Sequence, residues 1–134
     1  MIGIVVVTHA GLADELLHAA ELILGSFEAV AAVSIGRHMS VDTAEEELKK
    51  AVNLVGKDGD GTMILTDLFG GTPTNISAEF LRDGAVEILT GVNLPMLIKG
   101  VGARVNQKLD GLAALLKDYG KNAIMRPSEL LRSA

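Results

Sequence analysis

Residues 2–25 read IGIVVVTHAGLADELLHAAELILG, and their pattern of apolar residues indicates the class of fold. The run from Ile2 to Val7 is β-branched and apolar on both faces, which is typical of a central strand in a parallel sheet. From Leu12 onward the apolar residues recur at helical spacing, and Gly25 ends the segment. A buried strand followed directly by an amphipathic helix is the unit from which parallel α/β sheets are built.

The rest of the chain repeats this alternation of strand and helix. Further strands are predicted at residues 29–35, 62–66, 86–90 and 122–126. Further helices are predicted at residues 41–55 and 72–82, from residue 94, and at residues 104–119 with Val105, Leu109, Leu112 and Leu116 facing inward. Ser40 and Thr72 are the predicted N-caps of the helices that follow them, and Pro73 suits a first helical position. We therefore expect an α/β fold with an open, mainly parallel sheet flanked by helices.

Length and composition restrict the class of protein. The 134 residues suffice for a single domain at positions 1–134, with a core over about residues 1–126 and a short tail at 127–134. A net charge of −5, with three Phe, one Tyr and no Trp, argues against a nucleic-acid-binding surface. The absence of cysteine excludes disulfides and thiolate chemistry.

The distribution of apolar and basic residues predicts where the protein acts. No apolar run approaches the ~18 residues that a membrane span needs, so no direct membrane insertion is expected. No Lys or Arg precedes Arg37, so the first residues lack the basic region of a signal peptide. We therefore expect a cytoplasmic protein.

Two polar side chains that could carry chemistry follow predicted strands. His9 follows the first strand and Asp67 follows the third, and sites in open α/β sheets gather beyond the carboxyl ends of strands. A neutral imidazole can attack phosphorus through one bare nitrogen while a carboxylate holds the proton on the other nitrogen. His9 is therefore the candidate nucleophile and Asp67 its candidate partner. No cluster has the spacing of metal ligands, and no cofactor is expected.

Donors for a phosphoryl group are predicted at two helix starts, where free backbone N–H groups and the helix dipole favour an anion. Gly70 and Gly71 would allow the backbone to approach closely, and the Thr72 hydroxyl could add a donor. Ala10 and Gly11, which follow His9, open the other helix. These five residues form the candidate phosphate-binding set.

Three segments together resemble a known family. They are VVTHAGLA at residues 6–13, LTDLFGGTPTN at 65–75 and TGVNLPML at 90–97. Their order and spacing resemble the mannose-family enzyme IIA component of the phosphoenolpyruvate-dependent sugar phosphotransferase system (PTS), over essentially the whole chain. The resemblance implies a four-stranded parallel sheet in the order 2-1-3-4. It also implies a homodimer that exchanges a C-terminal strand, here at about residues 122–126.

The resemblance further implies a phosphotransferase that works through a phosphohistidine. The histidine matching His9 accepts a phosphoryl group from the phosphocarrier protein HPr and passes it to a IIB component. The aspartate matching Asp67 hydrogen-bonds the ring nitrogen that is not phosphorylated, and Thr72 falls near the phosphoryl group. Because the sequence ends at Ala134 without a fused IIB domain, a free-standing IIA component is expected.

Other interpretations remain open at this point. A regulatory phosphoprotein of the same family would signal by docking partners without sugar transport. The IIA-like subunit of dihydroxyacetone kinase, a receiver domain and a flavin-binding domain are further alternatives on related folds. Arg37, His38 and Met39 follow the second predicted strand and are candidates for a partner-docking rim. His18 lies among acidic residues on a polar helix face, which favours a solvated surface position.

Overall fold

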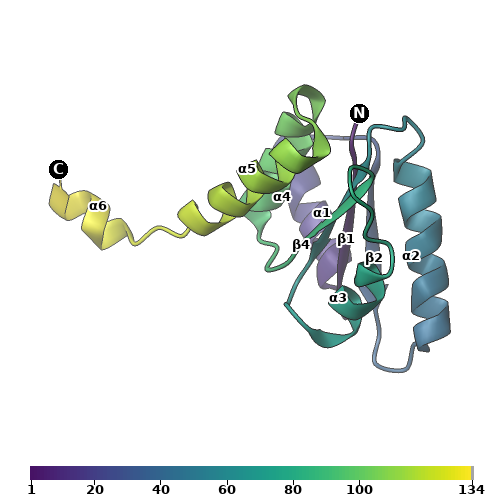
Figure 1. Cartoon of the computed structure of the whole chain (residues 1–134). Helices are drawn as coiled ribbons and strands as arrows, with labels where there is room; N and C mark the ends of the chain where they lie inside the picture. Colours follow the sequence, from purple (N-terminus) through teal and green to yellow (C-terminus); the bar gives the residue numbers. More distant parts are fainter. Residues whose placement is uncertain (134) are drawn as a thin grey trace.

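The computed structural model describes residues 1–133 and has alternating strands and helices (Figure 1). In chain order the elements are β1 (Gly3–His9), α1 (Leu12–Leu24), β2 (Val30–Ile35), α2 (Val41–Val55), β3 (Thr62–Thr66), α3 (Gly71–Ala78), β4 (Val86–Leu89), α4 (Leu94–Ala103), the 3₁₀ turn η1 (Arg104–Asn106), α5 (Leu109–Asn122) and α6 (Pro127–Ser133). The predicted α/β class is confirmed, and the Ser40 cap of α2 forms as expected, since its side chain accepts from the Thr43 N–H.

The four strands form one parallel sheet in the order β2-β1-β3-β4, as the resemblance implied. β1 lies in the interior of the sheet, with Val5 paired to Ala31 of β2 and to Ile64 of β3. Residues 2–8 are buried throughout, which agrees with a strand that is apolar on both faces. The same order leaves β4 as an edge strand.

Helices cover both faces of the sheet and enclose two apolar cores (Figure 1). On one face, Ile4 and Val6 pack with residues of α1, α4 and α5. On the other face, Val5 and Val7 pack with residues of α2 and α3. Alternate residues of β1 therefore serve opposite cores, which fixes the strand's register and the position of its carboxyl end.

The predicted helix at residues 104–119 is divided, and Arg104 accounts for the division. The buried Arg104 guanidinium donates to the carbonyl oxygens of Glu28 at 2.6 Å, Ala29 at 3.0 Å and Ile2 at 3.3 Å. Burial lowers the pKa of this guanidinium from its usual value, and the charge of Glu28 opposes that effect. Gln107 and Lys108 are then extended before α5 begins.

The inward face predicted for this segment is correct only within α5. Leu109, Leu112 and Leu116 are buried. Val105 was predicted to face inward with them, but it is exposed because it lies in the 3₁₀ turn rather than in the helix. A helical periodicity that is extended across a break in the helix therefore predicts the wrong orientation for a residue such as Val105, which lies before the break.

Three further predictions about helix α3 are wrong. The N-cap is Gly70 rather than Thr72, so Thr72 is the second residue of the helix and Pro73 is the third rather than the first. α3 ends at Ala78, several residues before the predicted end near 82, and the chain then turns back through Arg82, which bridges to Val86. Gly70 and Gly71 have positive φ angles of 85° and 76°, so the chain enters the helix in a conformation that glycine adopts readily.

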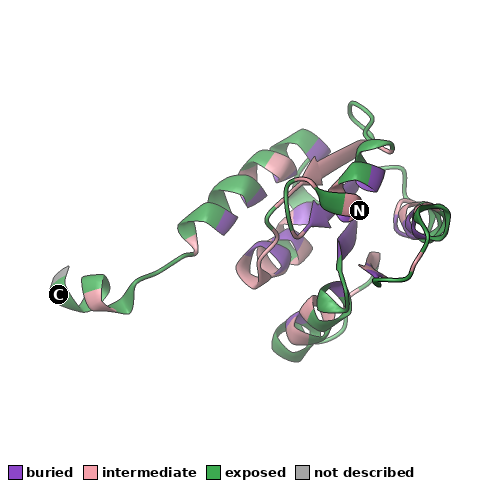
Figure 2. Cartoon of the chain, turned by 90° about the horizontal axis from the view of Figure 1, so that it is seen from below, coloured by how far each residue is buried: buried purple, intermediate pink, exposed green. Residues whose placement is uncertain are grey.

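The predicted C-terminal strand does not form within the described chain, whereas its exchange with a second copy stays a prediction. α5 continues to Asn122, and the described chain has no strand at residues 122–126. An extended segment becomes a strand only when it pairs with a neighbour, and the segment leaves the sheet without one. Pro127 then begins α6 within the short predicted tail, and the first helical position suits proline. Figure 1 shows α6 lying apart from the body, and Figure 2 shows no buried position over residues 127–132.

Candidate functional site

The strand order brings His9 and Asp67 together at the carboxyl edge of the sheet. β1 and β3 are neighbours, with Val7 paired to Thr66, so His9, the last residue of β1, and Asp67, the residue after β3, lie at adjacent strand ends. The His9 Nδ1 atom lies 2.9 Å from Asp67 Oδ2. The ring is half exposed, at 51%, whereas the Asp67 side chain is 14% exposed. The largely buried Asp67 carboxylate therefore fixes the position of the half-exposed His9 imidazole.

The contacts of Asp67 assign the proton on the neutral His9 ring. Oδ2 also accepts the backbone N–H of His9 at 2.9 Å. An ionised carboxylate only accepts hydrogen bonds, so Nδ1 must carry the ring proton and donate it. Nε2 is then the bare nitrogen, with a lone pair available for attack on an electrophile. The other carboxylate oxygen, Oδ1, is buried without a hydrogen-bond partner among the described residues.

The N-terminus of α3 lies beside the bare nitrogen of His9. A Cβ added to Gly71 would come within 3.1 Å of both Nε2 and Cε1 of the His9 ring. α3 has no side-chain N-cap, and Pro73 contributes no N–H. The backbone at exposed Gly71 and at half-buried Gly70 and Thr72 therefore lies next to this nitrogen, at a helix end of the kind that favours anions.

The N-terminus of α1 is less open to an anion than α3. The Ala10 N–H, one of the predicted phosphate donors, already donates to the Ile35 carbonyl at 2.9 Å. The Thr8 hydroxyl accepts the Ala13 N–H at 2.7 Å. Gly11 is the N-cap of α1 and is exposed. The geometry thus places the available donors mainly at α3, and Ala10 is not free to add one.

Two threonine hydroxyls, which the sequence analysis did not single out, lie behind the Asp67 loop. The Thr74 Oγ1 atom in α3 donates to the Leu68 carbonyl at 2.5 Å. It also lies 2.8 Å from Oγ1 of Thr66, the last residue of β3. A threonine eight positions after another gives no sequence signal for such a contact, because the contact depends on how the loop returns to the sheet.

The candidate docking residues lie on the loop after β2, at the same edge of the sheet. Arg37 and His38 are exposed, whereas Met39 is half buried and packs against the core beneath α2. The exposed side chains of Leu68 and Phe69 follow Asp67 in the other loop, and Phe69 is 85% exposed. An exposed Phe beside a catalytic candidate is a signal that the sequence analysis passed over.

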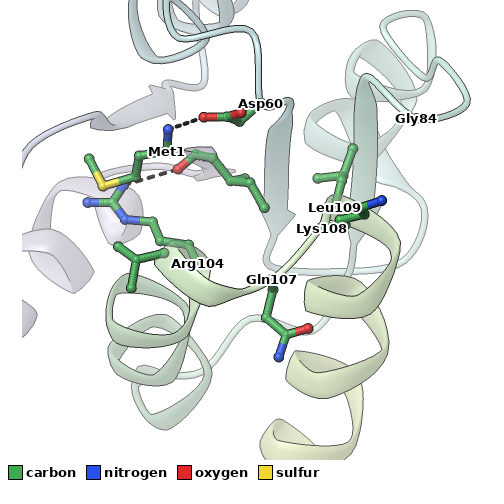
Figure 3. A pocket seen from close by; sticks show the side chains of 9 residues that line it. Met1, Asp60, Gly84, Arg104, Gln107, Lys108 and Leu109 are labelled. Carbon is green, nitrogen blue, oxygen red and sulfur yellow. Dashed lines mark hydrogen bonds and ion pairs between the residues drawn. The ribbon is translucent and has the colours of Figure 1, made fainter.

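A cavity of about 300 Å³ lies at the opposite end of the sheet, before β3 and β4 begin (Figure 3). It is lined by Met1, Ile2, Asp60, Gly84, Arg104, Val105, Gln107, Lys108 and Leu109. Figure 3 shows the N-terminal amine beside Asp60 and the Arg104 guanidinium at the Ile2 carbonyl. None of the candidate site residues lines this cavity, so it is separate from the His9 site.

Residues 1–133 contain neither a membrane-spanning helix nor a metal-binding cluster. No helix in residues 1–133 is both long and apolar enough to cross a bilayer. No group of three or more His, Asp or Glu side chains in that part of the chain is placed to hold a metal ion. His18 is exposed, and its Nδ1 atom lies 3.4 Å from Glu15 on the surface of α1.

Known proteins resemble this chain over most of its length. A family model described as "EIIA-man: PTS system fructose IIA component" matches residues 3–117. The "PTS system mannose-specific EIIAB component" of Escherichia coli (strain K12) is 30% identical over 125 residues, covering 92% of this chain. The chain spans only 38% of that relative's length. The "PTS system fructose-specific EIIA component" of Bacillus subtilis (strain 168) is 27% identical over 132 residues, covering 98% of this chain and 90% of that protein.

The fold agrees with these sequence relatives. The crystal structure of phosphotransferase system component EIIA from Streptococcus agalactiae matches with a TM-score of 0.86 and 31% sequence identity, covering 96% of this chain and 99% of that chain. The parallel sheet in the order 2-1-3-4, flanked by helices, is shared with such structures. Because the family model covers far more than half of the chain, this protein belongs to the EIIA-man family of PTS IIA components.

Proposed function

We propose that His9 accepts a phosphoryl group from phospho-HPr and passes it to a PTS IIB component. One observation carries the proposal: the exposed His9 ring is held at Nδ1 by Asp67 at 2.9 Å while Nε2 borders the start of α3. A nucleophile, the group that fixes its tautomer and an anion-binding helix end then meet at one edge of the sheet. The membership of the EIIA-man family supports the same reading.

The proposed transfer needs few groups. The Nε2 lone pair attacks phosphorus, a nitrogen–phosphorus bond forms, and the bond from phosphorus to the donor breaks, with its electron pair leaving on the donor. The phosphorylated ring keeps its proton on Nδ1 and gains positive charge, which Asp67 stabilises. The phosphoryl oxygens face the backbone N–H groups at Gly71 and Thr72 and the Thr72 hydroxyl. Transfer to the IIB component reverses these steps toward a new acceptor.

The direct test is the intact mass of the protein after incubation with phosphoenolpyruvate, enzyme I and HPr. We expect one acid-labile phosphoryl group per chain, because a phosphoramidate at a histidine hydrolyses in acid whereas a phosphoserine does not. A protein that takes no phosphoryl group from HPr of a matching host would contradict the proposal. Addition of a IIB component should then remove the group.

The remaining partner assignments follow from the same proposal. Arg37, His38 and Met39 would form part of the rim that HPr and the IIB component contact, together with the exposed Phe69. The proposal places the protein in the cytoplasm and involves no cofactor, nucleic acid or membrane insertion.

The relatives carry sugar-specific names, which do not favour the purely regulatory alternative. Those names differ between mannose and fructose, so they assign no sugar to this chain.

A Gly71→Ala variant should lose most of its phosphoryl transfer. The new Cβ would lie 3.1 Å from Nε2 and Cε1 of His9, so the ring must move by a few tenths of an ångström, which disturbs its contact with Asp67. Because a misplacement of 1 Å can cost about 10²-fold in rate, we expect this smaller shift to cost roughly 10-fold. The measurement is the initial rate of phosphorylation by phospho-HPr, followed by intact mass.

Gly70→Ala provides the matched control for that variant. Gly70 also has a positive φ angle, so alanine at either position costs about 1–3 kcal/mol of backbone strain. A Cβ at Gly70 meets nothing within 4 Å, however. We expect similar losses of thermal stability in the two variants and a clearly smaller loss of rate for Gly70→Ala. Equal losses of rate would show that strain in the loop, rather than crowding of His9, is responsible.

We also propose a homodimer in which the segment after α5 contacts a second copy. Ile124 and Met125 are exposed apolar residues, as are Leu130 and Leu131 of α6. The edge strand β4 has no partner on its outer side within the described chain. Removing residues 122–134 should therefore give a monomer or an unstable protein, as measured by light scattering and thermal unfolding. A truncated chain that remains a stable dimer would refute this assignment.

A further inference from the structure

The Thr74 hydroxyl lies at the centre of a short hydrogen-bonded chain behind the His9 site. Thr74 donates its one hydroxyl proton to the Leu68 carbonyl at 2.5 Å. The contact of 2.8 Å between Oγ1 of Thr74 and Oγ1 of Thr66 must then use the Thr66 proton. The direction of the chain is therefore fixed: Thr66 donates to Thr74, and Thr74 donates to Leu68.

This chain fixes the backbone on both sides of Asp67. Thr66 precedes Asp67, is fully buried, and its carbonyl accepts the Val92 N–H at 2.9 Å. Leu68 follows Asp67, and its carbonyl is the one that Thr74 holds. The carbonyl groups of the residues before and after Asp67 are thus held by two different segments, the loop that contains Val92 and helix α3.

The carboxylate of Asp67 depends on this backbone support. Its Oδ2 atom contacts the backbone N–H and the ring of His9, whereas its buried Oδ1 atom has no hydrogen-bond partner among the described residues. Both hydrogen bonds of the carboxylate are therefore made through Oδ2 to His9. Their geometry depends on where the main chain between Thr66 and Leu68 holds Asp67.

Thr74 also belongs to the helix end that borders His9 Nε2. It is the fourth residue of α3, one turn from Gly71. A single hydroxyl consequently connects the strand end that carries Asp67 with the helix end that would face the phosphoryl group. We propose that Thr74 is a positioning residue, which sets the Asp67–His9 contact relative to the N-terminus of α3. The proposal rests on the phosphoryl transfer proposed above, although Thr74 itself touches no reacting atom.

A merely structural role would look similar in a stability measurement, so the test needs a matched control. Ser77 lies in the same helix, is fully buried and donates to the Pro73 carbonyl at 2.6 Å. Its hydroxyl has no contact with the Asp67 loop. Ser77→Ala therefore removes a hydrogen bond within the helix but leaves the hydrogen bonds from Thr66 to Thr74 and from Thr74 to Leu68 intact. Thr74→Val removes both of those hydrogen bonds and nearly preserves the shape of the side chain. Thr74→Ser keeps the hydroxyl and should rescue function.

The experiment measures two quantities in the full-length variants. The first is the fraction of His9 that carries its proton on Nδ1, read from ¹⁵N NMR of the unphosphorylated protein, with Asp67→Asn as the reference for a lost contact. The second is the rate of phosphorylation as a function of phospho-HPr concentration. For Thr74→Val we expect a lower Nδ1–H fraction and a maximal rate reduced about 10-fold, with the half-saturating concentration unchanged. Thr74→Ser and Ser77→Ala should stay within about twofold of the wild type.

The outcomes separate this proposal from the proposed function. A wild-type tautomer and rate in Thr74→Val would overturn the positioning role, as would an equal loss of rate in Ser77→Ala. If Thr74→Val folds poorly, Thr66→Val interrupts the same chain one residue before Asp67 and should change the tautomer in the same direction. The tautomer is measured without any phosphoryl donor, so it still tests Thr74 if the wild type proves not to be phosphorylated.

Discussion

The His9→Ala variant is expected to take up no phosphoryl group from phospho-HPr under conditions that fully phosphorylate the wild type. Alanine has no lone pair to attack phosphorus, and the neighbouring groups at Asp67 and α3 only position and stabilise. The loss should therefore be complete rather than partial. Intact mass before and after acid treatment measures it directly.

His18→Ala is the control for that experiment. The His18 ring is exposed on α1 and lies 3.4 Å from Glu15, without a contact to the His9 site. Its removal should leave phosphorylation unchanged, because a solvated surface side chain contributes little to the fold. A variant without His9 that is still phosphorylated, together with a His18 variant that is not, would assign the phosphoryl group to His18 and refute the assignment to His9.

The main features of the fold can be predicted from the sequence because each depends on a short segment, and the same alternation of strand and helix recurs along the chain. The apolar run from Ile2 to Val7 is buried on both faces of the sheet. Ser40 caps α2, the helix that begins at the next residue. The pairing of His9 with Asp67 needed one non-local fact, the adjacency of β1 and β3. That fact came from the family resemblance, since a list of strands in chain order does not give their order in the sheet.

The features that sequence reasoning missed depend on contacts between distant segments. Arg104 interrupts the predicted helix because three carbonyls some 75 to 102 positions away accept its guanidinium. The N–H of Ala10 looked free as a phosphate donor, yet the Ile35 carbonyl of the neighbouring strand occupies it. Residues 122–126 have strand-like composition but no strand beside them in this chain. The partners of these residues are distant in the sequence, so the residues on either side of them give no indication of the contacts.

The Asp67→Asn variant should still fold and should transfer the phosphoryl group roughly 10²- to 10⁴-fold more slowly. Asp67 Oδ2 accepts two donors, the backbone N–H and the ring Nδ1–H of His9, each at 2.9 Å. An asparagine oxygen placed there would put the NH₂ group at the buried Oδ1 position, which has no acceptor among the described residues and costs about 1–3 kcal/mol.

The opposite rotamer is no better for the reaction. An NH₂ group facing His9 would make Nδ1 the acceptor and move the ring proton to Nε2, the nitrogen that must attack phosphorus. Both rotamers also lose the negative charge that supports the phosphorylated ring. Asp14→Asn tests the alternative that any carboxylate near this edge suffices, because Asp14 lies in the first turn of α1 and accepts the Ser34 hydroxyl at 2.6 Å. We expect that variant to react at nearly the wild-type rate; an equal loss in both would mean that the net charge of the edge, and not the tautomer of His9, controls the transfer.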